Sequence, residues 1–199
     1  MRQLLFILFL LTGLTSAGFS QKANPGIILW NPARTVSVSD FIVVPDSSTR
    51  ITGDHMAVTR TGITYSLTAK PGSKNFEITI YATMHKPNSF IRERVLDAPR
   101  GSINYLMNHE QKHFDISEIY AREAVKAIRG KRFTKNYTKE VNNLMQGIFK
   151  QSEALHDLYD KETGNGTNAA EQSEWNNRIQ SRLSALEAYK HKTIAMRVY

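Results

Sequence analysis

The chain has 199 residues, a formal net charge of +8 at pH 7 and no cysteine. The missing cysteine excludes disulfides, cysteine nucleophiles and a lipid anchor on cysteine. The basic residues are scattered, which fits solvated loops and helix ends, with weak attraction to anionic envelope surfaces as the alternative. Without a stripe of basic and aromatic residues, a nucleic-acid partner is not expected.

The first 20 residues have the organisation of a secretory signal peptide. Arg2 supplies positive charge, residues 4–14 are almost entirely apolar, and residues 15–20 are mostly small. We expect cleavage after Ser20, with Ala17 as the other candidate site. Residues 21–199 then form a single domain, and no later apolar stretch is long enough to span a membrane. The sequence therefore predicts a secreted or periplasmic protein.

The first half of the mature chain has the patterns of β-strands. Short apolar or alternating runs occupy residues 27–30, 36–44 and 56–67, and the last run is divided at residues 61–62. Residues 75–82 alternate most clearly, because Phe76, Ile78, Ile80 and Ala82 share one side. A turn at residues 70–73 precedes this strand, and a long loop over residues 85–99 is expected after it.

The second half changes to the period of α-helices. Helices are expected over residues 102–128 and 138–159, with Ser102 as the N-cap of the first and Gly130 at its end. A third helix should begin at Asn168, since Glu171 follows three residues later in a capping-box arrangement. Strands followed by helices predict an α+β fold, in which a mainly antiparallel N-terminal sheet packs on the first helix and two further helices follow.

The expected first helix carries His109-Glu110-Gln111-Lys112-His113, the H-E-x-x-H pattern of zinc metalloproteases. Residues four apart share one face of a helix, so two imidazoles can bind one zinc ion there. Zinc lowers the pKa of a bound water toward ~7, and Glu110 is placed to act as the general base. The alternative is a solvated helix face with two unrelated histidines.

A sheet followed by a helix with this motif resembles the zincin plan, in which the active-site helix packs under a twisted sheet. An edge strand of such a sheet can pair with an extended peptide. Residues 58–67 and 76–82 are the candidates for that strand.

The extended motif covers residues 106–116. Further parts of the same pattern are Trp30, residues 57–59, 62–65 and 159–163, and Glu118, Tyr120, Ala121, Arg122, Gln172 and Trp175. On these residues, and mainly on the extended motif, the chain from about residue 30 to residue 178 resembles a bacterial family of predicted secreted zinc-dependent proteases, formally a domain of unknown function. The resemblance implies a zincin-like fold, a zinc cofactor and a peptide or protein substrate.

The chain departs from this family pattern at one position. The resemblance implies a histidine two residues after Thr163 as the third zinc ligand, but the residue there is Asn165. An amide oxygen is neutral and binds zinc poorly. Glu162 lies on the inward side of the second helix if that helix continues, so Glu162 or Asn165 is the candidate third ligand. A capping or surface role is the alternative for Glu162.

Other polar residues have two possible roles each. Asp160 is expected to point away from the inward side of the second helix, and His156 and Asp157 to lie on its more exposed side. Tyr159 could stabilise an oxyanion or be a core tyrosine with a satisfied hydroxyl. Asp115 could orient a ligand imidazole or face solvent. Two further expectations concern residues elsewhere in the chain: Glu118 pairs with Arg122, and His55, His85 and His191 have no assigned role.

Three functions follow from these observations. The leading hypothesis is a secreted zinc metallohydrolase, most simply a peptidase, with His109 and His113 as ligands and Glu110 as general base. The second is a catalytically inactive zincin-like envelope protein that acts as a binding module, which Asn165 favours. The third is a helical interaction module in which the motif is accidental.

Overall fold

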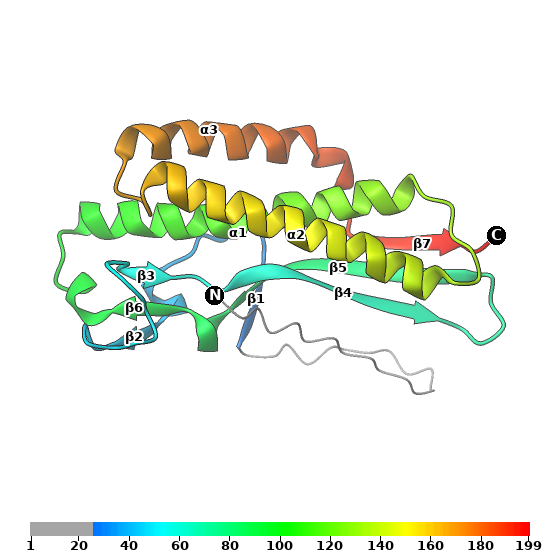
Figure 1. The fold of residues 1–199 in the computed structure, drawn as a ribbon, viewed down its shortest axis with the longest axis horizontal. Helices are drawn as coiled ribbons and strands as arrows, with labels where there is room; N and C mark the ends of the chain where they lie inside the picture. Colours follow the sequence, from blue (N-terminus) through cyan, green and yellow to red (C-terminus); the bar gives the residue numbers. More distant parts are fainter. Residues whose placement is uncertain (1–25) are drawn as a thin grey trace.

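The computed structural model describes residues 26–199 (Figure 1). The expected signal peptide and its cleavage site therefore lie outside the described residues. A four-stranded sheet contains β1 (Ile27–Leu29), β4 (Thr61–Ala69), β5 (Asn75–His85) and β7 (Thr193–Arg197), and a smaller sheet contains β2 (Ile42–Val44), β3 (Ala57–Val58) and β6 (Phe90–Arg92). Three helices follow β6: α1 (Arg100–Arg129), α2 (Tyr137–Thr163) and α3 (Ala169–Ala185).

Strand β5 is the centre of the larger sheet. Along one edge it pairs antiparallel with the whole of β4, and along the other it pairs with β1 at one end and β7 at the other. Phe76, Ile78, Ile80 and Ala82 are all at most 2% exposed, so the predicted alternation places their side chains in the core. Among the described residues β4 has no partner beyond β5, so β4 is the edge strand of the two candidates.

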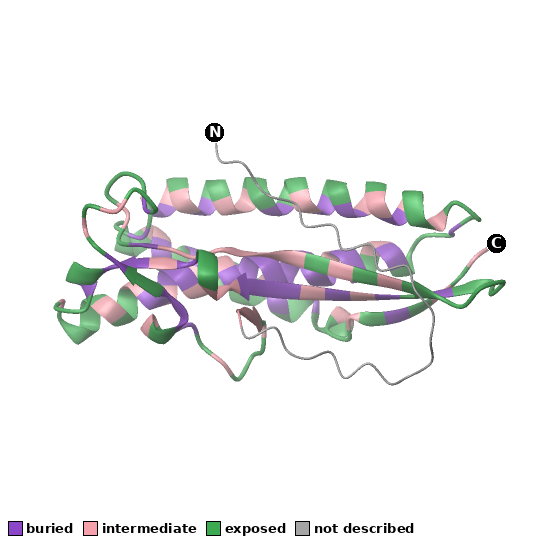
Figure 2. Ribbon diagram, turned by 90° about the horizontal axis from the view of Figure 1, so that it is seen from below, coloured by how far each residue is buried: buried purple, intermediate pink, exposed green. Residues whose placement is uncertain are grey.

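The helices form a layer against one face of the larger sheet. In Figure 1, α1 lies next to the strands, α3 lies on the opposite side of α1, and α2 runs beside α1. Figure 2 shows α1 largely buried behind the strands, whereas the long outer helix α2 has an exposed side. The α+β fold of mainly antiparallel sheets packed against three helices is confirmed, although β2 pairs with β6 in parallel. In the described part of the chain, no helix is both long and apolar enough to cross a bilayer.

The helix boundaries follow the sequence closely, with one error at the start of α1. Asn168 caps α3 by accepting a hydrogen bond from the backbone N–H of Glu171, and Gly130 ends α1. Ser102 is not the cap of α1, because Pro99 holds that position and the helix begins one turn earlier than expected. Proline fixes φ near the value that a helix start needs and has no N–H to satisfy.

The short strands were predicted less well than the helices. Residues 36–44 form a strand only over β2, since a single 3-10 turn (Val38–Asp40) precedes it. The expected loop at 85–99 contains β6, and β7 was not expected at all. Strands of three to five residues give too few alternations to detect, and long-range pairing is what forms them.

Candidate metal centre

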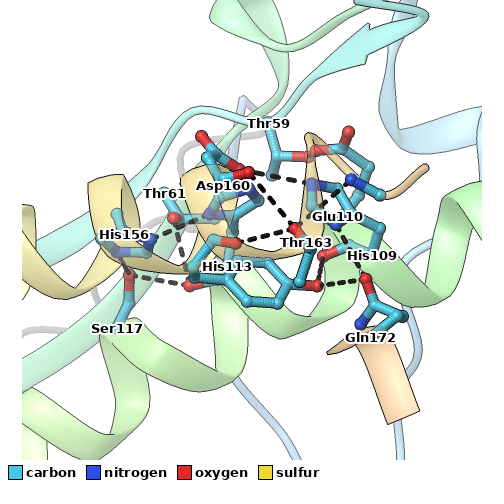
Figure 3. Close-up of polar contacts among 12 residues, drawn as sticks. Thr59, Thr61, His109, Glu110, His113, Ser117, His156, Asp160, Thr163 and Gln172 are labelled. Atoms are coloured by element: carbon cyan, nitrogen blue, oxygen red, sulfur yellow. Dashed lines mark hydrogen bonds and ion pairs between the residues drawn. The ribbon is translucent and has the colours of Figure 1, made fainter. Parts of the chain in front are cut away.

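The two motif histidines point the same ring nitrogen toward one place. His109 and His113 lie on consecutive turns of α1, with ring centroids 5.1 Å apart and ring planes nearly perpendicular. Both Nε2 atoms face Oδ1 of Asp160, at 3.3 Å from His109 and 2.9 Å from His113 (Figure 3). The helical spacing thus converges the imidazoles as expected, and a carboxylate from a different helix completes the group.

Asp160 takes the place that was expected for another residue. The expectation that Asp160 points away from the inward side of α2 is wrong, because its carboxylate contacts both imidazoles. Glu162 instead accepts hydrogen bonds from Trp175 (2.9 Å) and Arg178 (3.3 Å), on the side of α3. Two residues of helix turn the side chain by ~200°, so Asp160 and Glu162 cannot face the same neighbour.

Asn165 lies outside the group formed by the two histidines and Asp160. It is exposed, and its backbone N–H donates to the carbonyl of Asp160 at 2.7 Å, which closes the end of α2. Residues 164–166 all have positive φ, with +55° at Asn165. The chain reverses here into α3, and Asn165 tolerates this left-handed conformation better than most residues with a side chain.

The second ring nitrogen of each histidine is also held. Nδ1 of His109 lies 3.0 Å from Oε1 of Gln172, and Nδ1 of His113 lies 2.9 Å from Nδ1 of His156. Nε2 of His156 in turn lies 3.4 Å from the hydroxyl of Ser117. Such partners fix the tautomer and orientation of a metal-binding imidazole. The expectation that His156 lies on an exposed side is wrong, because it faces α1.

Burial and charge set the protonation of these groups. Burial, and then the electrostatic influence of His113, lower the pKa of His156 to about 3, so His156 is neutral at pH 7 and its Nδ1 can accept a hydrogen bond from Nδ1 of His113. Burial alone would raise the pKa of Asp160, but hydrogen bonds from both motif histidines outweigh it and hold that pKa far below the usual range. Burial opposes protonation of His109, yet the hydrogen bond to Asp160 and the charge of Glu110 raise its pKa.

Glu110 lies in a buried position beside the imidazoles. Its side chain is almost inaccessible to solvent, and one carboxylate oxygen accepts a short hydrogen bond from the hydroxyl of Thr59. Thr59 follows β3, so the strand side of the site fixes the orientation of this carboxylate (Figure 3). The family resemblance included Thr59 but implied no role for it, because its contact joins segments 51 residues apart.

Two other predicted residues have structural roles. Tyr159 is fully buried, stacks on His109 with a centroid distance of 4.7 Å and donates its hydroxyl proton to Gln172 at 2.9 Å. It is therefore a core tyrosine with a satisfied hydroxyl. Asp115 neither orients an imidazole nor faces solvent: it is buried and accepts hydrogen bonds from Trp30 and Gln111.

The expected pair of Glu118 with Arg122 is confirmed, although both side chains are buried. Nε of Arg122 donates to Glu118 at 2.9 Å, and Lys192 binds the other oxygen of the same carboxylate at 2.5 Å. These ion pairs contain none of the groups that contact His109 or His113.

The donor set of the site fits a tetrahedral metal ion. Two imidazole nitrogens and one carboxylate oxygen all lie within 4.8 Å of one another. Zinc bonds of ~2.0–2.1 Å at tetrahedral angles separate two ligands by ~3.3–3.4 Å, close to the distances from Asp160 to the histidines. Two histidines and one carboxylate with an open fourth position are the ligand pattern of catalytic zinc.

The sequence matches the model of one protein family, described as bacterial proteins of unknown function (DUF922), over residues 45–166. This match covers more than half of the chain. The chain belongs to this family. The matched part contains His109, His113 and Asp160, so the whole candidate metal group lies within the family region. Comparisons with curated proteins and with solved structures found no match.

Proposed function

We propose that this member of the DUF922 family is a secreted zinc-dependent peptidase of the bacterial envelope. The single observation that carries the proposal is the convergence of His109, His113 and Asp160 beside the buried carboxylate of Glu110. Two imidazoles and a carboxylate would hold the ion. Bound zinc would acidify a water molecule and polarise the carbonyl of a substrate.

Glu110 is the general base of the proposed reaction. It follows the first ligand on the same helix, and the hydrogen bond from Thr59 holds its carboxylate in place. Glu110 takes a proton from water as the oxygen attacks the peptide carbonyl carbon. The same proton then passes to the amine nitrogen as the C–N bond breaks, which leaves one new carboxyl and one new amine.

The edge of the larger sheet supports a peptide as the substrate. Strand β4 begins two residues after Thr59, and the hydroxyl of Thr61 contacts the carbonyl of His113 at 3.4 Å. An extended peptide that adds to such an edge would be held by main-chain hydrogen bonds next to Glu110. The expected signal peptide supports a location outside the cytoplasm.

The alternative of an inactive binding module derives from Asn165. The position of Asp160 weakens that argument, because a third candidate ligand exists that does not depend on residue 165. The two functions differ in their need for Glu110: a peptidase requires this carboxylate for catalysis, whereas a binding module does not require it.

The test combines metal analysis with one substitution. The mature protein purified from a bacterium should contain about one zinc ion per chain and cleave peptides in a fluorogenic library. Cleavage should stop with a chelator. Glu110→Gln should keep the zinc and lose roughly 100-fold or more of the hydrolysis, the scale of a lost general base.

Glu123→Gln is the matched control, since Glu123 lies on the same helix but faces Arg182 at 4.0 Å. It should retain both zinc and activity. Zinc-loaded native protein that cleaves no peptide in a broad library would overturn the peptidase proposal in favour of the binding module. Protein without stoichiometric zinc would favour an accidental motif.

A further inference from the structure

A cavity of about 340 Å³ opens beside His109, on the side of the site toward the N-terminus of α1. Its walls are mainly apolar and come from four parts of the chain, one of which is the turn after α2. The apolar lining residues are Met56 before β3, Val95 and Ala98 before α1, and Tyr105 and Leu106 in the first half of α1.

Large apolar side chains remain exposed at this cavity. Met56 is 40% exposed and Tyr105 is 36% exposed, and both line the cavity. Grouped apolar surface in contact with water is unfavourable by about 25 cal/mol per Å². Such groups, when gathered around a concave surface, mark a place where an apolar ligand binds.

The charges around the cavity fit an uncharged occupant. Among the lining residues other than His109, Arg94 is the one that carries a charge. Its Nε already lies 3.3 Å from the sulfur of Met56 and 3.8 Å from Asp46. The volume is at the lower end of the ~300–1,000 Å³ of small-molecule sites. A single large side chain therefore suits the cavity better than an extended ligand does.

The turn at residues 164–166 joins the cavity to the candidate metal centre. A Cβ on Gly166 would lie 3.0 Å from Cγ of His109, so the backbone of this turn packs directly on the imidazole. Asn165 and Gly166 line the cavity together with His109. An occupant of the cavity thus lies against a residue whose Nε2 faces the metal position.

We infer that this cavity is the subsite for a large apolar side chain, of phenylalanine or leucine, in the residue next to the cleaved peptide bond. This inference rests on the proposed peptidase function, because a subsite next to the cleaved bond requires that the protein cleaves peptides. The substrates are then unfolded or extended protein segments rich in apolar residues.

The experiment compares two peptides that differ only in phenylalanine or alanine at the position next to the bond that the protein cleaves. For native protein, kcat/KM should be at least about tenfold higher with phenylalanine, because even one methylene in an apolar pocket gives ~10–200-fold discrimination. Ala98→Phe and Ser102→Phe each place a ring in the cavity from a different segment, and each should bring the ratio close to one. Asn104→Phe, an exposed residue of the same helix outside the cavity lining, should keep the native ratio.

Binding measurements separate this inference from the proposed function. The same two peptides, fluorescently labelled, are titrated with Glu110→Gln protein in the presence of zinc, and anisotropy gives Kd. Tighter binding of the phenylalanine peptide that either filling variant abolishes supports the subsite, even if native protein hydrolyses nothing. Hydrolysis or binding without a preference for phenylalanine overturns the assignment of this cavity as a subsite. A preference for phenylalanine that survives both filling variants overturns it as well. The peptidase proposal is judged separately, by the effect of Glu110→Gln on hydrolysis.

Discussion

Asp160→Asn removes a negative charge from the candidate metal centre while keeping the size of the side chain. Oδ1 of Asp160 lies 3.3 Å from Nε2 of His109 and 2.9 Å from Nε2 of His113, so the carboxylate is the shared neighbour of both ligands. Changing a group that only orients a ligand weakens metal binding by ~10–100-fold. Loss of the carboxylate itself should therefore weaken zinc binding by about 100-fold or more.

This loss of affinity has a measurable effect on stability. At a fixed large excess of free zinc, a factor of 100 in affinity changes the free energy of unfolding by about 2.7 kcal/mol. In a domain of 150–250 residues, ~1 kcal/mol shifts Tm by roughly 2–4 °C. The rise in Tm caused by zinc should therefore be smaller by roughly 5–10 °C in Asp160→Asn. Thermal unfolding followed by circular dichroism, with buffered zinc and with a chelator, measures this difference.

Glu162→Gln is the matched control for this measurement. Glu162 lies two residues further along α2, but its carboxylate contacts Trp175 and Arg178 instead of the imidazoles. The variant should lose some stability in both conditions and keep the full zinc-dependent rise in Tm. The ligand assignment is refuted if Asp160→Asn keeps the native zinc effect, or if Glu162→Gln loses it.

Three further predictions concern the groups around the motif histidines. His156→Ala should weaken zinc binding by ~10–100-fold in a competition titration, because Nδ1 of His113 loses its partner at 2.9 Å. His156→Gln should lose less zinc affinity, since the amide oxygen of glutamine can still accept the hydrogen bond. Gly166→Ala should lower the free energy of unfolding, measured by urea denaturation, by roughly 1–3 kcal/mol, because φ is +83° and the new Cβ meets His109. Gly147→Ala, in the middle of α2 with open space around it, should raise that free energy by ~0.5–1 kcal/mol. Equal effects of the two substitutions would contradict the packing of the turn on His109. The pKa of metal-free His109 is raised, so zinc displaces a proton from this imidazole over a higher pH range than from an ordinary histidine, and the apparent affinity should increase as pH rises through that pKa. Calorimetry in buffers of different ionisation enthalpy should detect fewer released protons in Asp160→Asn, and an unchanged proton count in that variant would argue against Asp160 as the cause.

The sequence by itself determined the features that depend on neighbours within a few residues. The shared face of His109 and His113 follows from the four-residue spacing in any helix, so the pair was found without a structure. The cap at Asn168, the end of α1 at Gly130 and the alternation of β5 are local in the same sense. These signals were sufficient for the α+β fold and for two of the three candidate ligands.

Only the tertiary structure decided which residues from elsewhere in the chain complete the site. The rotation of α2 against α1 brings Asp160 and His156 to the imidazoles and turns Glu162 toward α3. A rotation of α2 by about half a turn would bring Glu162 to the imidazoles in place of Asp160. Gln172 and Thr59 reach the site from α3 and from the segment after β3, across separations of 63 and 51 residues. Local patterns carry no record of such contacts, because the packing of whole elements sets them.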